Sequence, residues 1–558
     1  MAADSRAPAF LRPSRLWDRL SELALDFTPM VFAVLAFAAG AVMLVSSAAP
    51  TLVSRLGALT RLMPILVVEL SHFLGSVVAF LLLLIAGGLW RRQRGAYWAA
   101  LTLLLGGAMF SLLRRAPAEE PLLLVGVSLM LAPCRSAFRR RSRLTAGGLG
   151  PVWLTAIALT LAAAAWLGLF AYRDVPYTDQ LWWTFLRDAD VSRFLRAAAA
   201  IAVLSLLLGP YLLLSRPPGR WRGRPSPDAV AQTAEVFAQA QDAPTLAALA
   251  QTGDKDLLFS ASGRSFLAFG VRGARFVALA GPAGDPAERR ELLWSFLELA
   301  DREGRGAVLY GFGDELLPDV AGLGMTARKA GETAAVDLAG FSLTGKARQD
   351  LRTARNRAQR EGAVFEVLPP GAASRCGAEL RAVSDLWLAR QGGQEKGFSL
   401  GRFDLAYLDR GPVAVVRKAG EVAAFANLLT NRARGEISID LMRYGQAEGF
   451  LMDFLFAEAM TWAQGEGFAT FDLGMAPLAG LDTHELAPLF ARLGALVFEE
   501  GGPLYGFQGV RAYKAKFGPA WKPVYIAVTP GVPMFSALLD VALLTSGGWA
   551  GMLGVKGR

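Results

Sequence analysis

The sequence is poor in the residues on which most metal and nucleophilic sites depend. Its 558 residues include two cysteines, Cys134 and Cys376, and two histidines, His72 and His484. Two cysteines so far apart build neither a disulfide framework nor a cysteine-rich metal site. The shortage of histidine removes most zinc chemistry and argues against a Ser-His-Asp triad. Catalysis is therefore expected to rest on carboxylates, lysine, arginine, tyrosine or backbone groups, and no metal is predicted.

Charged residues are also scarce. They make up 19% of the chain, while hydrophobic residues make up 53%. Soluble globular proteins have roughly 25% charged residues, and the mean hydropathy of this chain is +0.35. The composition excludes a single soluble domain and predicts a membrane part joined to a soluble part. The net charge of +10 favours anionic partners.

Six apolar runs approach the length needed to cross a bilayer, which is about 20 residues. They span 27–48, 64–90, 97–113, 121–133, 151–172 and 194–214, and the fourth is short enough to be re-entrant. The first run is long and follows an arginine-containing leader, so no cleavable signal peptide is predicted. We therefore expect a cytoplasmic leader (1–26), a transmembrane domain (27–214) and a basic, proline-rich linker (215–228).

Basic residues are distributed unevenly among the segments between these runs. Alternate segments carry 16 and 7 lysines plus arginines. The positive-inside rule places the richer set, and all residues after 224, in the cytoplasm. Within the second run, Glu69 and His72 are polar groups at membrane depth. They serve either interhelical hydrogen bonding or a lipid-headgroup or proton site.

Beyond the linker the pattern becomes mixed α/β, and its order of elements occurs twice. The first copy is expected as a helix at 229–249, strands at 266–271 and 275–280, a helix at 286–303, and strands at 307–310 and 333–338. The second is expected as strands at 413–416, 422–429 and 436–442, a helix at 450–464 and a strand at 469–473. This duplication predicts a tandem α+β acetyltransferase-like (GNAT-type) domain. Its subdomains are placed at 229–340 and 341–530, followed by a tail at 531–558.

A strongly basic helix is predicted at 346–360, which has six basic residues and one acid. Arg348, Arg352 and Arg355 recur at i, i+4 and i+7, so a helix presents them on one face. Such a face is either solvated or a phosphate track for a nucleic acid or anionic lipid. The single acid favours the track.

The predicted strand at 436–442 leads into a charged pair, Asp440 and Arg443. Strict alternation puts the two side chains on opposite faces unless the strand ends or bulges between them. One interpretation is an ion pair at a strand end. In the other, Asp440 holds an ammonium group and Arg443 holds a phosphate or a developing oxyanion.

Aromatic and cationic residues are mixed near the C-terminal end, from Tyr505 to Phe517. A helix there sets Arg511 beside Lys514, and Tyr513 beside Lys516 or Phe517. Two such cations are suited to stabilise a tetrahedral ester intermediate, although a purely structural basic helix fits the same pattern.

Two loops are candidates for a substrate pocket. Glu395 and Lys396 lie in a polar loop that either borders a pocket or forms an ordinary turn. The loop at 445–449 stands where an acyl-coenzyme-A enzyme binds pyrophosphate. It carries Glu448 and no cation, which argues against coenzyme A.

The longer motifs resemble the phosphatidylglycerol lysyltransferase family, also called lysylphosphatidylglycerol synthase or multiple peptide resistance factor. The similar segments are 395–429 (beginning EKGFSLGRFDLAYL), 436–444 (EISIDLMRY), 449–460, 471–481, 504–527 and, in the membrane half, 69–84 (ELSHFLGSVVAFLLLL). The resemblance covers roughly residues 25–530.

This resemblance implies a multi-pass enzyme of the bacterial inner membrane with its catalytic domain in the cytoplasm. Its implied reaction moves lysine from lysyl-tRNA to the glycerol hydroxyl of phosphatidylglycerol, with no cofactor besides aminoacyl-tRNA as co-substrate. The modified lipid lowers the negative charge of the membrane and gives resistance to cationic antimicrobial peptides. Larger family members carry an additional N-terminal flippase bundle, whereas about six spans are expected here. The resemblance therefore implies the synthase activity and leaves lipid flipping open.

The resemblance also implies roles for the candidate residues. Asp440, Arg443, Lys514 and Lys516 are expected to be catalytic. Substrate binding is expected by the same resemblance at Glu395, Tyr505 and Arg511. The residue patterns described above, and not the resemblance, add Lys396 for substrate binding, Arg348, Arg352 and Arg355 for phosphate binding, and Glu69 and His72 for a polar membrane site.

Alternatives stay open at this point. The donor is lysyl-tRNA or, as the second choice, alanyl-tRNA. An acyl-coenzyme-A-dependent membrane acyltransferase and a lipid transporter are weaker alternatives. The partners are aminoacyl-tRNA, phosphatidylglycerol and the bilayer, and the membrane domain leaves room for a homo-oligomer.

Overall fold

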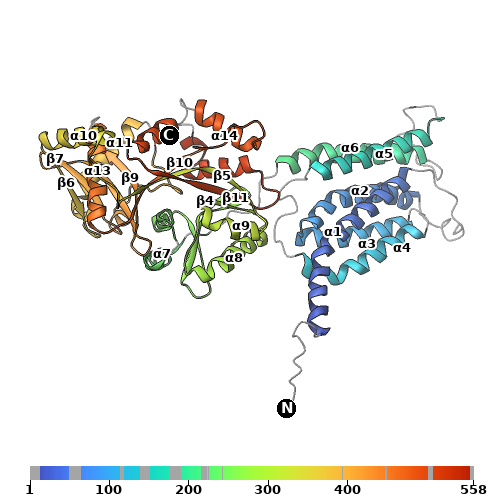
Figure 1. Cartoon of the computed structure of the whole chain (residues 1–558). Coiled ribbons are helices and arrows are strands. Elements are labelled where there is room, and N and C mark those ends of the chain that lie inside the picture. The colour runs from blue at the N-terminus through green and yellow to red at the C-terminus, as the bar shows by residue number, and fades with distance from the viewer. Residues whose placement is uncertain are drawn as a thin grey trace, which may run out of the picture. The chain divides into compact units, whose positions relative to one another are not determined.

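The structure is a computed structural model. It describes residues 13–48, 65–113, 118–138, 151–174, 178, 190–214, 223, 225–241, 243–391, 394–445, 449–500 and 507–552. The chain divides into two compact units, one formed mainly by residues 1–219 and the other by residues 220–558 (Figure 1).

The first unit is a bundle of apolar helices. They are α1 (Pro13–Ala48), α2 (Ile65–Trp90), α3 (Arg94–Leu113), α4 (Glu119–Leu131), α5 (Pro151–Ala171) and α6 (Asp190–Leu214). Among the described residues, five stretches are long and apolar enough to cross a membrane. The fourth, expected to be short, reaches 19 residues because a 3-10 turn continues α4 to Ala137. The sixth predicted run lies in α6 but is not among these five. The polytopic membrane bundle is thus confirmed.

Close packing of α1 against α2 explains why α1 has glycine and alanine at its buried positions. A Cβ atom on Gly40 would lie 2.8 Å from the carbonyl oxygen of Ala79. Ala33, Ala36 and Ala39 on the same helix are also buried. Small residues of this kind let the backbones of membrane helices approach each other.

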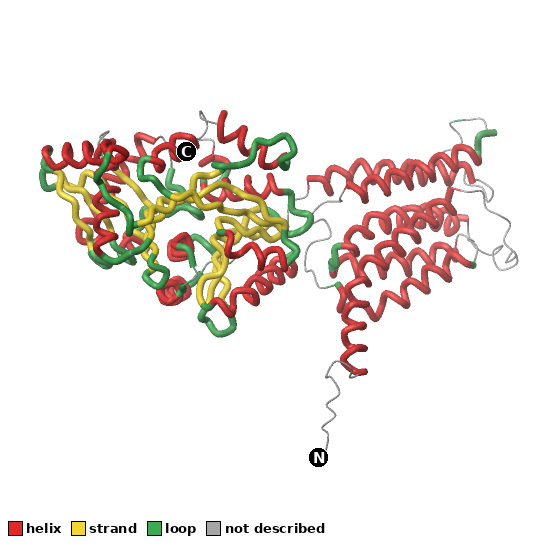
Figure 2. Tube along the Cα trace, in the orientation of Figure 1, coloured by secondary structure: helices red, strands yellow, loops and turns green. Residues whose placement is uncertain are grey.

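The second unit is built on one eleven-stranded sheet, drawn in yellow in Figure 2. In chain order the strands are β1 (Asp256–Phe259), β2 (Ser265–Arg272), β3 (Arg275–Gly284), β4 (Gly306–Phe312), β5 (Thr326–Asp337), β6 (Ala363–Leu368), β7 (Val413–Lys418), β8 (Glu421–Asn431), β9 (Glu436–Tyr444), β10 (Thr470–Pro477) and β11 (Ala520–Val528). Their order across the sheet is β1-β2-β3-β4-β11-β5-β10-β9-β8-β7-β6.

Helices flank this sheet in the second unit. They are α7 (Pro227–Gln239), α8 (Arg289–Arg302), α9 (Leu317–Gly322), α10 (Gln349–Arg360), α11 (Gly377–Gln391), α12 (Leu405–Leu408), α13 (Gly449–Gly465), α14 (Leu489–Glu500), α15 (Phe507–Ala515), α16 (Met534–Thr545) and α17 (Trp549–Met552). The predicted helix at 229–249 is wrong in its second half, because α7 ends at Gln239 and Thr245–Thr252 form a 3-10 turn. Pro244 has no N–H group to continue a helix, and its ring disfavours a helical residue before it.

The sheet repeats one arrangement of elements twice. In the first copy, α8 connects β3 to β4, which pair in parallel; in the second, α13 connects β9 to β10, which also pair in parallel. Each copy then places its last strand in the other half, because β5 pairs with β10 and β11 pairs with β4. The two halves therefore share a continuous sheet instead of forming two separate ones.

The fourth strand of each copy is interrupted at a glycine. Gly311 in β4 and Gly474 in β10 both have φ of +81°. The pairing register of each strand shifts at that point, which marks a β-bulge. A residue with a side chain adopts this backbone conformation only with strain. After its bulge β10 diverges from β9, since the two pair only through Thr470–Asp472 and Glu436–Ser438.

Candidate functional site

A bulge in β9 decides how its charged side chains face. Ala426 pairs with Met442 and Leu428 pairs with Ile439, so Asp440 and Leu441 together lie opposite the single residue Asn427. The Asn427 side chain stabilises the bulge by accepting a hydrogen bond from the Leu441 N–H, with Oδ1 and N 2.7 Å apart.

The bulge brings Asp440 and Arg443 to one face of β9. Each of them contacts the loop 394–402, Asp440 through Gly401 and Arg443 through Glu395. The negative charge of Asp440 also acts on the guanidinium of Arg443. The sequence allowed either strict alternation, with Asp440 and Arg443 on opposite faces, or a strand end or bulge between them. The structure has the bulge.

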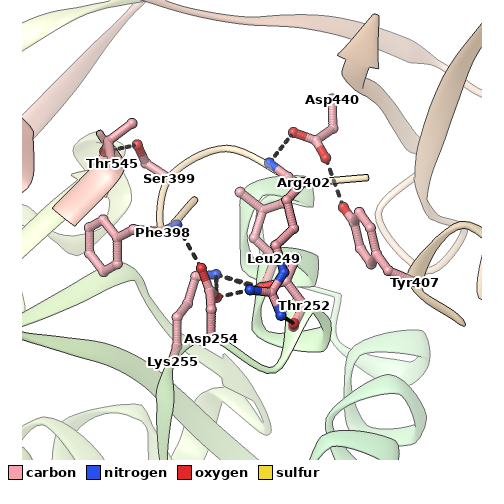
Figure 3. Close-up of polar contacts among 11 residues, drawn as sticks. Leu249, Thr252, Asp254, Lys255, Phe398, Ser399, Arg402, Tyr407, Asp440 and Thr545 are labelled. Atoms are coloured by element: carbon pink, nitrogen blue, oxygen red, sulfur yellow. Dashed lines mark hydrogen bonds and ion pairs between the residues drawn. The ribbon is translucent and has the colours of Figure 1, made fainter. Parts of the chain in front are cut away.

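Two donors hold the carboxylate of Asp440, as Figure 3 shows. Its Oδ1 accepts the Gly401 N–H at 2.8 Å, and its Oδ2 accepts the Tyr407 hydroxyl at 2.9 Å. Burial raises the pKa of Asp440, although hydrogen bonds from Gly401 and Tyr407 oppose the shift. Burial, together with the Asp440 charge, also raises the pKa of Tyr407 well above its usual value. Asp440 is thus a stronger base than a solvated aspartate, while Tyr407 stays a neutral donor.

A second charged pair at this site comes from the first half of the sheet. Lys255 is 1% exposed. Its Nζ donates to the Leu249 carbonyl at 2.7 Å, to Thr252 Oγ1 at 2.9 Å and to Asp254 Oδ1 at 2.5 Å. Burial lowers the pKa of Lys255, whereas the charges of Asp254 and Asp440 oppose that shift. Both halves therefore contribute titratable groups to the Asp440 region.

The loop 394–402 is fixed at several points (Figure 3). The Phe398 N–H donates to Asp254 Oδ2 at 2.8 Å, and Ser399 shares a hydrogen bond of 2.8 Å with the Thr545 hydroxyl. The Gly397 N–H donates to the Thr545 carbonyl at 2.9 Å. Phe398 has φ of +57°, a strained conformation for a residue with a side chain. These contacts set the position of the Gly401 N–H that binds Asp440.

Arg443 is buried and only partly satisfied. Its Nη2 pairs with Glu395 Oε2 at 2.9 Å, and its guanidinium lies 3.9 Å from the centre of the Trp387 ring. Burial lowers the pKa of Arg443, opposed by Glu395 and Asp440. Arg443 Nε and Glu395 Oε1 are buried without a hydrogen-bond partner among the described residues. One donor and one acceptor are thus left for a ligand.

Lys514 lies at a separate cavity of about 340 Å³ between the diverging strands. The other lining residues come from β9, α13, β10 and α15 and are largely apolar: Met442, Phe456, Leu473, Gly509, Val510 and Tyr513. The Lys514 Nζ donates to the Gly474 and Met475 carbonyls at 2.8 and 2.9 Å. Burial lowers the pKa of Lys514 to about 8, opposed by the charge of Asp472. An apolar cavity with one cation suits an amphiphilic anion.

The neighbours of Lys514 in the sequence have other partners. Lys516 pairs with Asp453 at 3.2 Å and lies 4.9 Å from the centre of the Tyr513 ring. Arg511 pairs with Glu332 at 3.3 Å and stacks on Trp521. The prediction that Tyr513 and Lys516 meet is confirmed.

Two of the sequence candidates lie outside the described residues, namely Tyr505 and Glu448. Lys396 is described and exposed, on the same loop as Glu395. Among the residues that the structure describes, no group of three or more His, Cys, Asp or Glu side chains is arranged to hold a metal ion.

The three arginines of the predicted phosphate track each have a partner within the protein. Arg348 donates to the carbonyls of Lys516 and Phe517 at 2.7 and 2.8 Å. Arg352 donates to the Leu343 carbonyl at 2.7 Å, and Arg355 pairs with Glu458 at 2.6 Å. These contacts fasten α10 to its surroundings, and phosphate binding by the three arginines stays a prediction.

In the membrane bundle, Glu69 is buried and forms ion pairs with Arg193, at 3.0 Å, and with Arg196. This links α2 to α6. His72 lies about one turn further along α2 and is partly buried, and its carbonyl accepts the Ser76 hydroxyl at 3.0 Å. These ion pairs are contacts between two helices, as one of the two interpretations of Glu69 predicted. A role in binding a lipid headgroup or a proton stays a prediction.

The sequence analysis did not single out Tyr407, Asp254 or Lys255. Tyr407 stands inside the motif at 395–429, where Asp404 caps the short helix α12 that carries it. Asp254 and Lys255 precede β1 and belong to no motif quoted above. The contact of Asp254 with residue 398 spans 144 positions of sequence, so no local signal was available.

Comparisons with known proteins place this site in a family context. Residues 234–528 match the family model described as phosphatidylglycerol lysyltransferase, C-terminal. The phosphatidylglycerol lysyltransferase of Bacillus subtilis is 32% identical over 509 residues, which are 88% of this chain and 57% of that protein. The enzyme of the same name from Staphylococcus aureus is 33% identical over 298 residues, 53% of this chain and 35% of that protein. The chain therefore spans between about one third and little more than half of these relatives.

Two solved structures resemble the second unit. The L-PGS structure from Bacillus licheniformis is 34% identical with a TM-score of 0.51, covering 58% of this chain and 99% of that one. A C-terminal domain from Agrobacterium fabrum is 38% identical with a TM-score of 0.52, covering 60% of this chain and 99% of that one. Both similarities support the α/β architecture of the second unit.

Proposed function

Because the chain belongs to the phosphatidylglycerol lysyltransferase family through its C-terminal domain, we propose that it transfers lysine from lysyl-tRNA to the glycerol hydroxyl of phosphatidylglycerol. The observation that carries this proposal is the family match over residues 234–528, which contains Asp440, Arg443 and Lys514. The membrane bundle supports a lipid substrate, because five of its stretches can cross a bilayer among the residues described.

The proposed reaction is a transesterification that needs no redox step. The lipid hydroxyl oxygen bonds to the aminoacyl carbonyl carbon, the ester bond to the tRNA ribose breaks, and the hydroxyl proton ends on the ribose oxygen. The donor ester is already activated, so the protein supplies positioning, proton transfer and stabilisation of the oxyanion. Such a reaction requires neither a histidine nor a cysteine nucleophile.

The geometry supports a role for each main residue. Asp440, whose pKa is raised by burial, accepts the proton of the lipid hydroxyl. The free Nε of Arg443 binds the oxyanion or a phosphate oxygen, and the free Oε1 of Glu395 binds an ammonium group of the donor amino acid. Lys514, which lines the apolar cavity, binds the lipid phosphate.

We place the protein in the bacterial inner membrane with the soluble unit in the cytoplasm, where aminoacyl-tRNA is available. The excess of basic residues in alternate segments supports this orientation. Each transfer converts a lipid of charge −1 into one of charge +1. Cationic antimicrobial peptides are then expected to bind the membrane less strongly.

The test is to express the chain in a host that lacks aminoacylated lipids and to analyse its phospholipids by mass spectrometry. We expect lysylphosphatidylglycerol with the natural sequence and at least about 100-fold less with Asp440→Asn, which keeps the shape but loses the base. Asp385→Asn is the matched control, because Asp385 is an exposed carboxylate on α11. A lipid of alanyl mass would overturn the choice of donor. No new lipid, despite inserted protein and charged tRNA, would overturn the reaction.

A further inference from the structure

Helix α14 (Leu489–Glu500) turns its apolar side to the outside of the protein. Leu489, Leu493, Leu496 and Val497 are 63%, 38%, 54% and 48% exposed. Their spacing of i, i+4, i+7 and i+8 gathers them on one side of the helix. A soluble surface helix normally has the reverse arrangement, with its polar side outward.

The opposite side of the same helix attaches it to the fold. Phe490 and Ala495 are buried. A Cβ atom on Gly494 would lie 2.5 Å from the Leu481 side chain, so α14 sits close against the segment after β10. Rotating α14 to bury its exposed leucines would therefore expose the side that is already packed against the fold.

The apolar surface continues onto a second helix. The rings of Phe490 on α14 and Phe535 on α16 lie 5.5 Å apart. Phe535 and Leu539 on α16 are 45% and 37% exposed. Figure 1 shows α14 at the periphery of the second unit. We call the six exposed residues Leu489, Leu493, Leu496, Val497, Phe535 and Leu539 the α14 face.

A lipid bilayer is the occupant that the rest of the chain favours. The same polypeptide carries five stretches able to cross a membrane among its described residues, so the soluble unit is held near a bilayer. Arg492 lies exposed beside the leucines, where an interfacial helix places a cation for lipid phosphates. Aliphatic side chains on one side and a flanking arginine are features of a helix that lies in the membrane interface.

The position of α14 in the chain connects this surface to the Lys514 cavity. The next helix, α15, carries Val510, which is 37% exposed and lines that cavity together with Lys514. Helices α14 and α15 are in contact, so a bilayer on the α14 face is close to the exposed lining residue Val510.

We propose that the α14 face docks into the interfacial layer of the bilayer and holds the soluble unit there. A lipid then reaches the Lys514 cavity without leaving the plane of the membrane. The docking rests on the exposed apolar residues of α14 and α16 and on the membrane-spanning stretches of the same chain, whereas the delivery of a lipid rests on the proposed function.

Docking is tested with the full chain in nanodiscs of phosphatidylcholine and phosphatidylglycerol. In a Cys134→Ser, Cys376→Ser background, an environment-sensitive fluorophore is attached at Leu493→Cys or Leu496→Cys. Val364→Cys on β6 is the matched control, because Val364 is also exposed, at 63%, and lies outside the α14 face. We expect a blue-shifted emission that lipids brominated in their acyl chains quench at least twofold at 493 and 496 but not at 364.

Two results of this experiment would overturn docking. Emission typical of water at 493 and 496 would mean that the face is solvated. A blue shift without quenching by brominated lipid would mean that protein covers the face, for example a second copy of the chain.

Delivery is tested by turnover of the variant Leu489→Gln, Leu493→Gln, Leu496→Gln. We expect at least about tenfold slower transfer to phosphatidylglycerol in vesicles and unchanged transfer to a water-soluble, short-chain phosphatidylglycerol, which also shows that the variant is folded. Equal loss with both lipids, or no loss with vesicles, would overturn delivery. No transfer by the natural sequence to either lipid would instead contradict the proposed function and leave the fluorescence result to decide docking.

Discussion

Burial sets the charge state of the ionisable side chains around the site. It raises the pKa of Asp440 and lowers the pKa of Lys255, because both charged forms lose contact with water. Lys514 is affected in the same direction as Lys255, from 10.5 to about 8. A lysine with that pKa is mostly charged at neutral pH and loses its charge within one or two pH units above it.

This shift predicts the alkaline limb of the pH profile. If the Lys514 cation binds the lipid phosphate, kcat/KM falls about tenfold per pH unit above pH 8, because the free enzyme then loses a proton that binding needs. The variant Lys514→Arg keeps its charge to much higher pH. We expect its limb to move upward by at least one pH unit, at whatever residual rate it retains. An unmoved limb would assign the proton to another group.

At the scale of elements, arginine side chains hold helices and loops together through hydrogen bonds and ion pairs. Arg348 binds the carbonyls of Lys516 and Phe517, just after α15 ends at Ala515. These two carbonyls lie beyond the last turn of α15, where the helix provides no N–H group for them, and the guanidinium satisfies both at once. Arg348 therefore supports the helix that carries Lys514.

Substitutions of Arg348 distinguish a structural role, through its hydrogen bonds to the Lys516 and Phe517 carbonyls, from a role in binding phosphate. Arg348→Ala is expected to destabilise the end of α15 locally by about 2 kcal/mol, because two charge-assisted hydrogen bonds are lost. Hydrogen exchange of the α15 amides should then accelerate by up to about 30-fold. Arg348→Lys keeps the charge but not the two-pronged geometry, so we expect it to resemble the alanine variant. Full protection and activity in the lysine variant would favour a simple electrostatic role.

At the scale of the whole molecule, strand exchange joins the two halves of the second unit. β11, from the second half, lies between β4 and β5 of the first. Without it, both of these strands present an unpaired edge inside the sheet. The stretches 229–340 and 341–530 thus exchange strands, and a subdomain boundary between them stays a prediction.

A fragment of residues 225–345 is therefore expected not to fold alone. It contains β4 and β5 but lacks β10 and β11, which cover their edges. We expect it to aggregate or to show no cooperative thermal transition by circular dichroism, whereas the fragment 225–552 shows one. A cooperative transition and a monomeric mass for the shorter fragment would contradict this view of the sheet.

The sequence by itself determined the features that depend on neighbouring residues. Long apolar runs marked the membrane bundle, because a bilayer selects for length and hydrophobicity along one helix. Short apolar runs separated by turns that contain Gly273 and Gly420 marked the hairpins β2-β3 and β7-β8. Recognisable motifs singled out Asp440, Arg443, Glu395 and Lys514 as candidates, and their roles stay predictions.

The tertiary structure decided what depends on distant partners. The β9 bulge, which places Asp440 and Arg443 on one face, forms against Asn427 on the neighbouring strand. Lys255 and Tyr407 meet the Asp440 region from segments 185 and 33 positions away in sequence. The pairing of β11 with β4 joins elements about 200 residues apart. No local pattern specifies these contacts, because each becomes favourable only after the rest of the sheet has brought its partners together.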